Sequence, residues 1–201
     1  GNKPVITANG QNYTFDAVLY ATGRKPNTAN IGLENTDITT NERGAIVVND
    51  TCESSVPGVY AVGDVNGGPQ FTYISLDDFR IVFGALTGNG QYTLKDRKNI
   101  PYTTFLTPPL ARVGLTEEDA INKGYTVKTK EMLVATMPRA HVNDYLKGAF
   151  KIVVNEENNL ILGATLYSQG AEELINLIKM AMDNNIPYTY FKNQIFTHPT
   201  M

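Results

Sequence analysis

The stretch 60-YAVGD-64 contains residue types that suit a ligand site at the end of a strand. Its apolar run closes in Gly-Asp and so puts the Asp64 carboxylate at the carboxyl end of a strand, the edge where open α/β sheets bind ligands. Gly63 allows a ligand to approach the backbone closely, and Asp64 can accept hydrogen bonds from hydroxyl groups. A helix expected from Thr72 onward aims its N–H groups at the same space. A motif this short, taken alone, is more often a strand end whose aspartate caps a turn.

His198, in 192-KNQIFTHPTM-201, is the second candidate for chemistry. An imidazole titrates near neutrality, which suits the exchange of a proton with a reacting group. Taken alone, a histidine four positions from the last residue is more often inert. The only other histidine, His141, is expected in a polar loop or strand end without a role. The single cysteine, Cys52, is expected to be a small apolar filler.

The composition excludes several classes of protein. Apolar residues make up 42% of the chain and the net charge is −3, without a basic stripe, so we expect no nucleic-acid partner. No apolar run approaches the ~18 residues of a membrane helix, and residues 1–10 lack the features of a signal peptide. One cysteine excludes an internal disulfide framework. We therefore predict a cytoplasmic location, no membrane partner and no metal site.

Residues 1–98 are predicted to contain a hairpin, buried strands and one helix. The hairpin is predicted at 5–15, because Asn9-Gly10 supplies the positive φ values that its turn needs. Continuous apolar runs predict strands buried on both faces at 17–21 and 59–62, with a short strand at 45–48. A helix is predicted from Thr72 to about Leu86, opened by a threonine cap. The apolar positions expected on one face of this helix are Ile74, Phe79, Val82 and Phe83.

The polar stretch 88–98 is predicted to separate two domains. Beyond it the pattern predicts strands and helices at these ranges: strands near 102–106 and over 125–135, 149–154 and 160–168, and helices over 116–123 and 171–184. Thr116 and Asp119 form a capping box for the first of these helices, and Gly124 ends it. The strands on either side of 155–159 are expected to pair as a hairpin.

Four segments occur in an order that identifies a family: 17-AVLYATGRKPNT-28, 56-VPGVYAVGD-64, 107-TPPLARVGLTEEDA-120 and the final His-Pro-Thr. Together they resemble the carboxyl-terminal part of the flavin-dependent pyridine nucleotide–disulfide oxidoreductases, which include glutathione reductase, dihydrolipoamide dehydrogenase and mercuric reductase. The resemblance covers essentially all 201 residues. It implies an α/β plus α+β chain: the end of an NAD(P)-binding domain at 1–22, the carboxyl-terminal segment of an FAD-binding domain at 23–98, and an α+β interface domain at 99–201.

The resemblance implies cofactor-binding roles for six residues, Gly23, Arg24, Gly63, Asp64, Phe71 and Thr72. It implies that Arg24 lies near the flavin or its pyrophosphate, where a fixed cation is useful. Asp64 is similar to the aspartate that binds the ribityl chain of FAD, and Thr72 to a threonine whose backbone N–H faces the pyrimidine edge of the flavin. Tyr73 departs from the family, in which proline or histidine is usual, and this puts the detail of the nicotinamide side in doubt.

The interface domain implied for the second half pairs two subunits, so we expect a homodimer. In the family, a terminal His-Pro reaches the partner's active site and exchanges a proton with a thiol of the redox disulfide, which makes His198 the catalytic candidate. A glutamate five residues later orients that histidine in the family, and it is absent because this sequence stops three residues after His198. The apolar stripe of the helix at 171–184 is expected to face its own core rather than a partner.

We expect the chain to be a fragment, because no G-x-G-x-x-G motif occurs and the redox cysteine pair is missing. Its parent is expected to be an enzyme that passes electrons from NAD(P)H through FAD to a disulfide or another acceptor. The fragment itself is expected to be inactive and to bind no cofactor tightly. The alternative is that the isolated chain is a cofactor-free dimerisation module. The stretch 137-MPRAHVND-144 resembles the mercuric-reductase-like branch, which includes bacterial flavoproteins that protect against reactive chlorine species, and the acceptor stays open.

Overall fold

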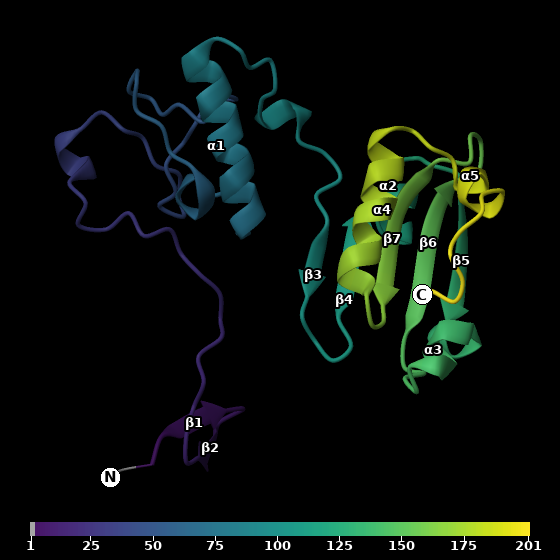
Figure 1. The fold of residues 1–201 in the computed structure, drawn as a ribbon. Coiled ribbons are helices and arrows are strands. Elements are labelled where there is room, and N and C mark those ends of the chain that lie inside the picture. Colours follow the sequence, from purple (N-terminus) through teal and green to yellow (C-terminus); the bar gives the residue numbers. More distant parts are fainter. Residues whose placement is uncertain (1–2) are drawn as a thin grey trace. The chain divides into compact units, whose positions relative to one another are not determined.

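The computed structural model describes residues 3–201, which form two compact units (Figure 1). The first unit ends at Asp96 and the second comprises Arg97–Met201, so the change of unit falls within the polar stretch 88–98. No helix within the described residues has the length and apolar character needed to cross a bilayer.

The first unit contains few regular elements. They are β1 (Val5–Ala8), β2 (Gln11–Thr14), the 3-10 helices η1 (Leu33–Asn35), η2 (Gly63–Asn66) and η3 (Leu94–Asp96), and the helix α1 (Thr72–Thr87). β1 and β2 pair antiparallel from Val5 opposite Thr14 to Ala8 opposite Gln11. Asn9 and Gly10 have φ values of 52° and 76°, which confirms the predicted hairpin and its turn.

The buried strand predicted at 17–21 is wrong. These residues form no strand, and the side chains of Leu19 and Tyr20 are 89% and 85% exposed. A strand buried on both faces depends on hydrogen bonds and packing from neighbouring strands. No other segment of residues 3–201 pairs with it.

The strands predicted at 45–48 and 59–62 are reduced to isolated bridges. Ile46 pairs with Thr40 and Tyr60 pairs with Glu53, each as a single antiparallel bridge. The prediction of a fully buried strand at 59–62 is therefore wrong, because one bridge on one side does not build a ladder.

Helix α1 buries only part of the predicted face, because Ile74 is buried and Val82 is partly buried but the two phenylalanines are not. Its buried residues are Ile74, Asp78 and Ile81, whereas Phe79 and Phe83 are 54% and 57% exposed. Periodicity located the helix correctly but assigned the aromatic side chains to the wrong face. The buried face includes a carboxylate, a residue type that an apolar count leaves out.

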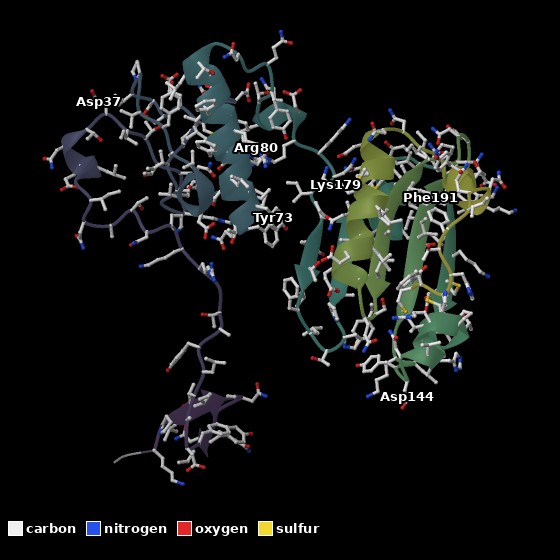
Figure 2. The ribbon with its side chains drawn as sticks, in the orientation of Figure 1. Asp37, Tyr73, Arg80, Asp144, Lys179 and Phe191 are labelled. Atoms are coloured by element: carbon white, nitrogen blue, oxygen red, sulfur yellow. The ribbon has the colours of Figure 1, made fainter. Side chains whose placement is uncertain are left out.

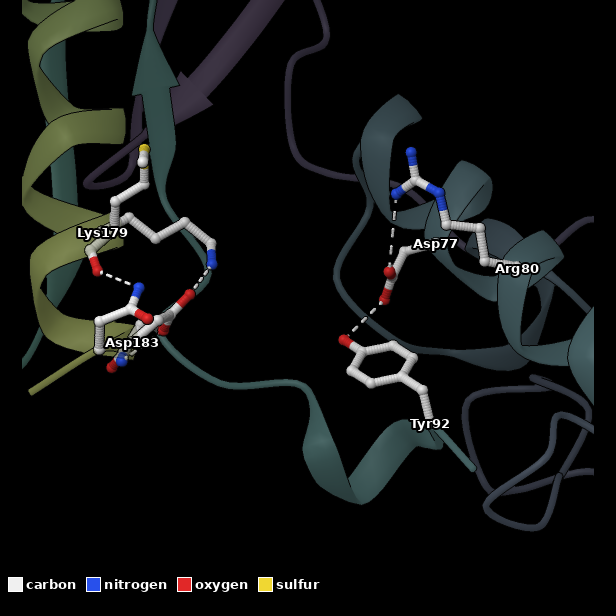
Figure 3. Close-up of polar contacts among 8 residues, drawn as sticks. Asp77, Arg80, Tyr92, Lys179 and Asp183 are labelled. Carbon is white, nitrogen blue, oxygen red and sulfur yellow. Dashed lines mark hydrogen bonds and ion pairs between the residues drawn. The ribbon is translucent and has the colours of Figure 1, made fainter. Parts of the chain in front are cut away.

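The loop that follows α1 is attached to the helix through Asp77 (Figure 3). The Tyr92 hydroxyl donates to one carboxylate oxygen of Asp77 at 3.4 Å, and Arg80 Nη1 lies 3.9 Å from the other. Both contacts are long and lie at the surface, so they join the loop to α1 only weakly.

The second unit is an antiparallel sheet with helices. Its elements are β3 (Tyr102–Thr104), β4 (Leu110–Gly114), α2 (Glu117–Asn122), β5 (Val127–Leu133), η4 (Val134–Thr136), α3 (Pro138–Val142), β6 (Ala149–Asn155), β7 (Ile161–Tyr167), α4 (Ala171–Asp183) and α5 (Tyr188–Lys192). The strand order is β3-β4-β7-β6-β5, with every neighbouring pair antiparallel. The predicted hairpin around 155–159 is confirmed as the β6–β7 pair, and β4, α3 and α5 were not predicted.

The core of the second unit lies between α4 and the strands β4 and β7 (Figure 1). Its buried residues are Ala111, Val113, Ala164, Leu166, Ala171 and Ile175. Leu174, Ile178 and Met182 of α4 pack against this cluster, which confirms that the stripe faces its own core. The predicted capping box of α2 is also confirmed: Thr116 Oγ1 accepts from the Asp119 N–H at 3.0 Å, and the Asp119 side chain accepts from the Thr116 N–H at 3.2 Å.

Asp183, the last residue of α4, has a partly buried carboxylate that accepts two hydrogen bonds (Figure 3). Lys179 Nζ donates to one of its carboxylate oxygens, and Asn99 Nδ2 donates to the other at 2.9 Å. Burial by itself raises the pKa of this carboxyl, but the bonds from Lys179 and Asn99 lower it overall below its ordinary value. A lowered folded-state pKa adds stability above the unfolded-state value, and that stability is lost as the pH falls through the folded-state value.

Asp183→Asn is therefore expected to lower the free energy of unfolding of the second unit at pH 7 by up to about 1 kcal/mol. The deficit should shrink at acidic pH, as the pH falls through the lowered folded-state pKa and the native carboxylate becomes protonated. Urea unfolding followed through the amide NMR signals of the sheet measures both values. Glu157→Gln, which neutralises an exposed carboxylate in the β6–β7 turn, serves as the matched control. A deficit of the same size at both pH values would contradict the assigned role.

Candidate functional site

Two of the candidate segments meet in the first unit through an ion pair. Arg24 Nη1 lies 3.7 Å from Asp64 Oδ2, and the two side chains are 73% and 45% exposed. Gly23 and Gly63, the residues before them, both have positive φ values, 112° and 72°. The structure thus brings together the Gly-Arg and Gly-Asp pairs, which lie forty residues apart in the sequence. Both charged groups remain accessible to a ligand.

Gly63 lies against the first turns of α1. A side chain at this position would have its Cβ 2.5 Å from Ser75 Oγ, which is closer than real Cβ atoms come. Its positive φ also disfavours any other residue. Glycine is therefore required here by the close packing of η2 on α1, which brings Asp64 near the beginning of that helix.

Asp78 on α1 holds this turn in place, and sequence reasoning missed it. Its side chain is fully buried, and Oδ2 accepts hydrogen bonds from the Gly63 N–H at 2.7 Å and from Asn66 Nδ2 at 2.9 Å. A buried carboxylate is costly unless hydrogen bonds compensate it, and these two donors come from the two ends of η2. The signal was present in the sequence, since Asp78 lies at helical spacing between Ile74 and Ile81.

The beginning of α1 supplies the third part of the candidate site. Thr72 is the first helical residue and Phe71 occupies the N-cap position in an extended conformation, without a side-chain cap. The predicted threonine cap is wrong by one position. The Thr72 N–H forms no hydrogen bond within the described part of the chain, as is usual for the first residues of a helix.

Two aromatic rings flank Thr72. Phe71 and Tyr73 are stacked, with ring centroids 5.0 Å apart and an interplanar angle of 9°. Tyr73 lies at the amino-terminal end of α1 (Figure 2), and partial burial raises the pKa of its phenol. The helix N-terminus therefore has a free N–H at Thr72, whose two neighbours in the sequence form a stacked aromatic pair. Such an N-terminus suits a group that carries negative charge.

His198 lies in the second unit. Its side chain is exposed and forms no hydrogen bond with the described residues. Thr200 Oγ1 donates to the carbonyl of Thr197 at 3.0 Å across the same turn. Met201 packs against a buried cluster of Val134, Met137 and Ala140, so the last residues are attached to the sheet unit.

The residues to which no role was given have structural contacts. His141 is in α3 rather than in a loop or strand end, because Pro138 begins a short helix, and its Nε2 lies 2.8 Å from the carbonyl oxygen of Ala135. Cys52 is fully buried. Within residues 3–201, no three His, Cys, Asp or Glu side chains are grouped so that they could hold a metal ion.

Comparison with known proteins matches both units to one family. The family described as pyridine nucleotide-disulphide oxidoreductase, dimerisation domain, matches residues 100–201, and the pyridine nucleotide-disulphide oxidoreductase family matches residues 1–78. The chain is 48% identical over 200 residues to the probable pyridine nucleotide-disulfide oxidoreductase RclA of Escherichia coli, covering all of the chain and 45% of that protein. It is 38% identical over 179 residues to a mercuric reductase of Staphylococcus aureus, covering 88% of the chain and 32% of that protein.

A solved structure is similar over the whole chain. The HOCl-induced flavoprotein disulfide reductase RclA from Escherichia coli superposes with a TM-score of 0.95 at 44% sequence identity, covering all of this chain and 46% of that one. The chain therefore spans less than half the length of these relatives.

Asp78→Ala is expected to destabilise the first unit by about 1–3 kcal/mol, because it leaves the buried Gly63 N–H without its acceptor. Asn66 Nδ2 keeps only its longer bond to the Ala61 carbonyl, at 3.3 Å. Asp77→Ala is the matched control, since it removes a neighbouring carboxylate whose bonds to Arg80 and Tyr92 are long. Urea unfolding followed through the amide NMR signals of α1 compares the two variants. Equal losses would show that Asp78 has no special part in holding the turn.

Proposed function

The chain belongs to the pyridine nucleotide-disulphide oxidoreductase family, and we propose that it forms the carboxyl-terminal part of an enzyme that passes electrons from NAD(P)H through FAD to an acceptor. The observation that carries the proposal is the ion pair between Arg24 and Asp64 beside the amino-terminal end of α1. Asp64 lies on the turn that Asp78 holds in place. In the proposed assignment, 1–22 ends the NAD(P)-binding domain, 23–98 belongs to the FAD-binding domain and 99–201 is the interface domain.

The groups present in the first unit fit an FAD. Asp64 offers a half-exposed carboxylate that can accept hydrogen bonds from the ribityl hydroxyls, and Gly63 lets the turn that carries it pack closely on Ser75 of α1. The free Thr72 N–H at the helix start suits the pyrimidine edge, where negative charge collects on reduction. Arg24 suits the pyrophosphate or the flavin edge. When bound, FAD supplies the hydride and electron chemistry, and these residues orient it.

The interface domain contributes a proton-transfer group in this proposal. His198 is exposed at the end of the second unit, and we assign it to exchange a proton with a thiol on the partner subunit of a homodimer. The match of residues 100–201 to a dimerisation domain supports the pairing. The similarity to RclA and to mercuric reductase supports a disulfide and a metal ion as the acceptor classes to test. A cytoplasmic location and the lack of a nucleic-acid partner stay predictions.

The alternative, a cofactor-free dimerisation module, is favoured by one observation: the second unit has its own sheet and buried core. The isolated 201-residue chain is expected to sediment as a dimer at tens of micromolar and to bind FAD only weakly, because it offers one wall of the cofactor site. Absorbance and equilibrium dialysis with FAD, combined with sedimentation velocity on the same preparation, measure both properties. Sub-micromolar FAD binding would contradict the weak-binding expectation, and a monomer would contradict the pairing.

In the complete enzyme, His198→Ala is expected to slow the thiol–disulfide step by a factor on the order of 10²–10⁴, the usual contribution of a general acid–base. Reduction of the flavin by NAD(P)H should stay nearly unchanged, because hydride transfer to the flavin needs no proton from this group. Stopped-flow measurement of flavin reduction, followed separately from turnover with acceptor, resolves the two half-reactions.

His141→Ala is the matched control for this variant, since it removes the only other histidine. It should leave both half-reactions at their original rates. Equal slowing of both half-reactions by His198→Ala would show that His198 shapes the flavin site, and the assigned role would then be wrong.

A further inference from the structure

A second concave site lies in the second unit, away from the residues assigned to FAD and to proton transfer. It is a hollow of about 470 Å³ between the beginning of the unit, the end of β4, the turn after α2 and the end of α4. Its floor is apolar and includes Ile100, Leu162 and Met182, with the ring of Tyr125 at one side. A volume and lining of this kind are typical of small-molecule sites.

Every charged side chain that lines this hollow is a cation. They are Arg97, Lys98 and Lys123, and no carboxylate is among the lining residues. Lys98 and Lys123 form no ion pair within the described residues. Asp183 attracts Lys98 through space, and Asp119 attracts Lys123, but neither carboxylate forms an ion pair with them. Both ammonium groups can therefore still pair with an anion.

The carboxylates closest to these cations are engaged elsewhere. Asp183 is bonded to Lys179 and to Asn99. Asp119 is held by the hydroxyl and the N–H of Thr116 in the capping box of α2. Neither side chain lines the hollow, so neither takes the place of a ligand there.

A smaller hollow of about 230 Å³ shares four lining residues with the first one: Tyr125, Ile161, Leu162 and Met182. Its polar lining consists of asparagines, among them Asn155 and Asn158. Asn155 Oδ1 accepts the Glu157 N–H at 2.9 Å, and Asn158 Oδ1 accepts the Leu160 N–H at 3.0 Å. Because these oxygens already serve the β6–β7 turn, the amide groups left for a ligand are N–H donors.

We propose that these two neighbouring hollows, here together called the cationic pocket, bind a small organic anion with an apolar or aromatic body. The anionic group, a carboxylate or a phosphate, pairs with Lys98 and Lys123, and the body lies on the floor formed by Leu162 and Met182 beside Tyr125. The asparagines donate to further oxygen atoms of the ligand. The site is independent of the flavin assignment, since all its residues lie in the second unit.

Two isosteric probes test this directly on the 201-residue chain. The anion 2-naphthoate and the neutral 2-naphthamide have the same aromatic body and differ in charge. Titration followed by amide NMR should show 2-naphthoate shifting the signals of Gly114, Leu115 and Tyr125, with an affinity at least about tenfold above that of the amide. Equal affinity for the two probes, or shifts confined to other residues, would overturn the proposal.

Charge-reversing variants identify the cations that bind. Lys123→Glu and Lys98→Glu, which lie in different segments, should each weaken 2-naphthoate binding by about tenfold or more and leave 2-naphthamide binding unchanged. Lys147→Glu makes the same change at an exposed lysine near the opposite end of β5, and it should leave both probes unaffected. If Lys147→Glu weakened 2-naphthoate binding as much as the other two variants do, the effect would come from net charge alone. That result would overturn the proposal.

Discussion

The hydrogen bonds from Gly63 and Asn66 to the buried carboxylate of Asp78 are the contact on which the first unit depends. This unit has no sheet beyond one exposed hairpin, so a backbone ladder does not define its shape. A carboxylate without access to water must keep its donors, and these donors fix η2 against α1. The same contact orients Asp64, which immediately follows Gly63, and brings it within reach of Arg24. A structural interaction and a proposed cofactor site therefore share one turn.

The second unit is stabilised differently. Its antiparallel ladder supplies hydrogen bonds between successive strands, and α4 covers a core drawn from β4 and β7. The ladder and the core join segments that lie far apart along the chain, since β4 pairs with β7 and α4 packs against both. The unit therefore contains its core within its own residues. Its polar contacts lie at the ends of elements, as in the Thr116–Asp119 capping box and the Lys179–Asp183 pair. Both the proposed dimer surface and the cationic pocket are built on this self-contained sheet.

The features that the sequence predicted best are those that depend only on residues close together in the sequence. The Asn9-Gly10 turn, the capping box and the helix α4 each follow from local rules, and the structure contains all three. The buried strands at 17–21 and 59–62 were predicted wrongly, because a parallel strand depends on partners that hydrophobicity alone does not reveal. Asp78 was missed for a different reason: the apolar periodicity that located α1 leaves charged residues out of the buried face. The ion pair between Arg24 and Asp64 joins two loops, and no spacing rule predicts such a contact.

The central claim is that the turn carrying Asp64 is already formed, without any cofactor, by the buried acceptor on α1. Hydrogen exchange at the Gly63 amide tests this most directly, because that N–H donates to Asp78 Oδ2 at 2.7 Å. In the cofactor-free chain, the Gly63 amide should exchange at least about a hundredfold more slowly than an unprotected amide of the same sequence context. The Leu19 amide, in an exposed segment without regular structure, provides the internal reference. Exchange of Gly63 as fast as that of Leu19 would show that the turn is not held, and the account of a preformed cofactor wall would be contradicted.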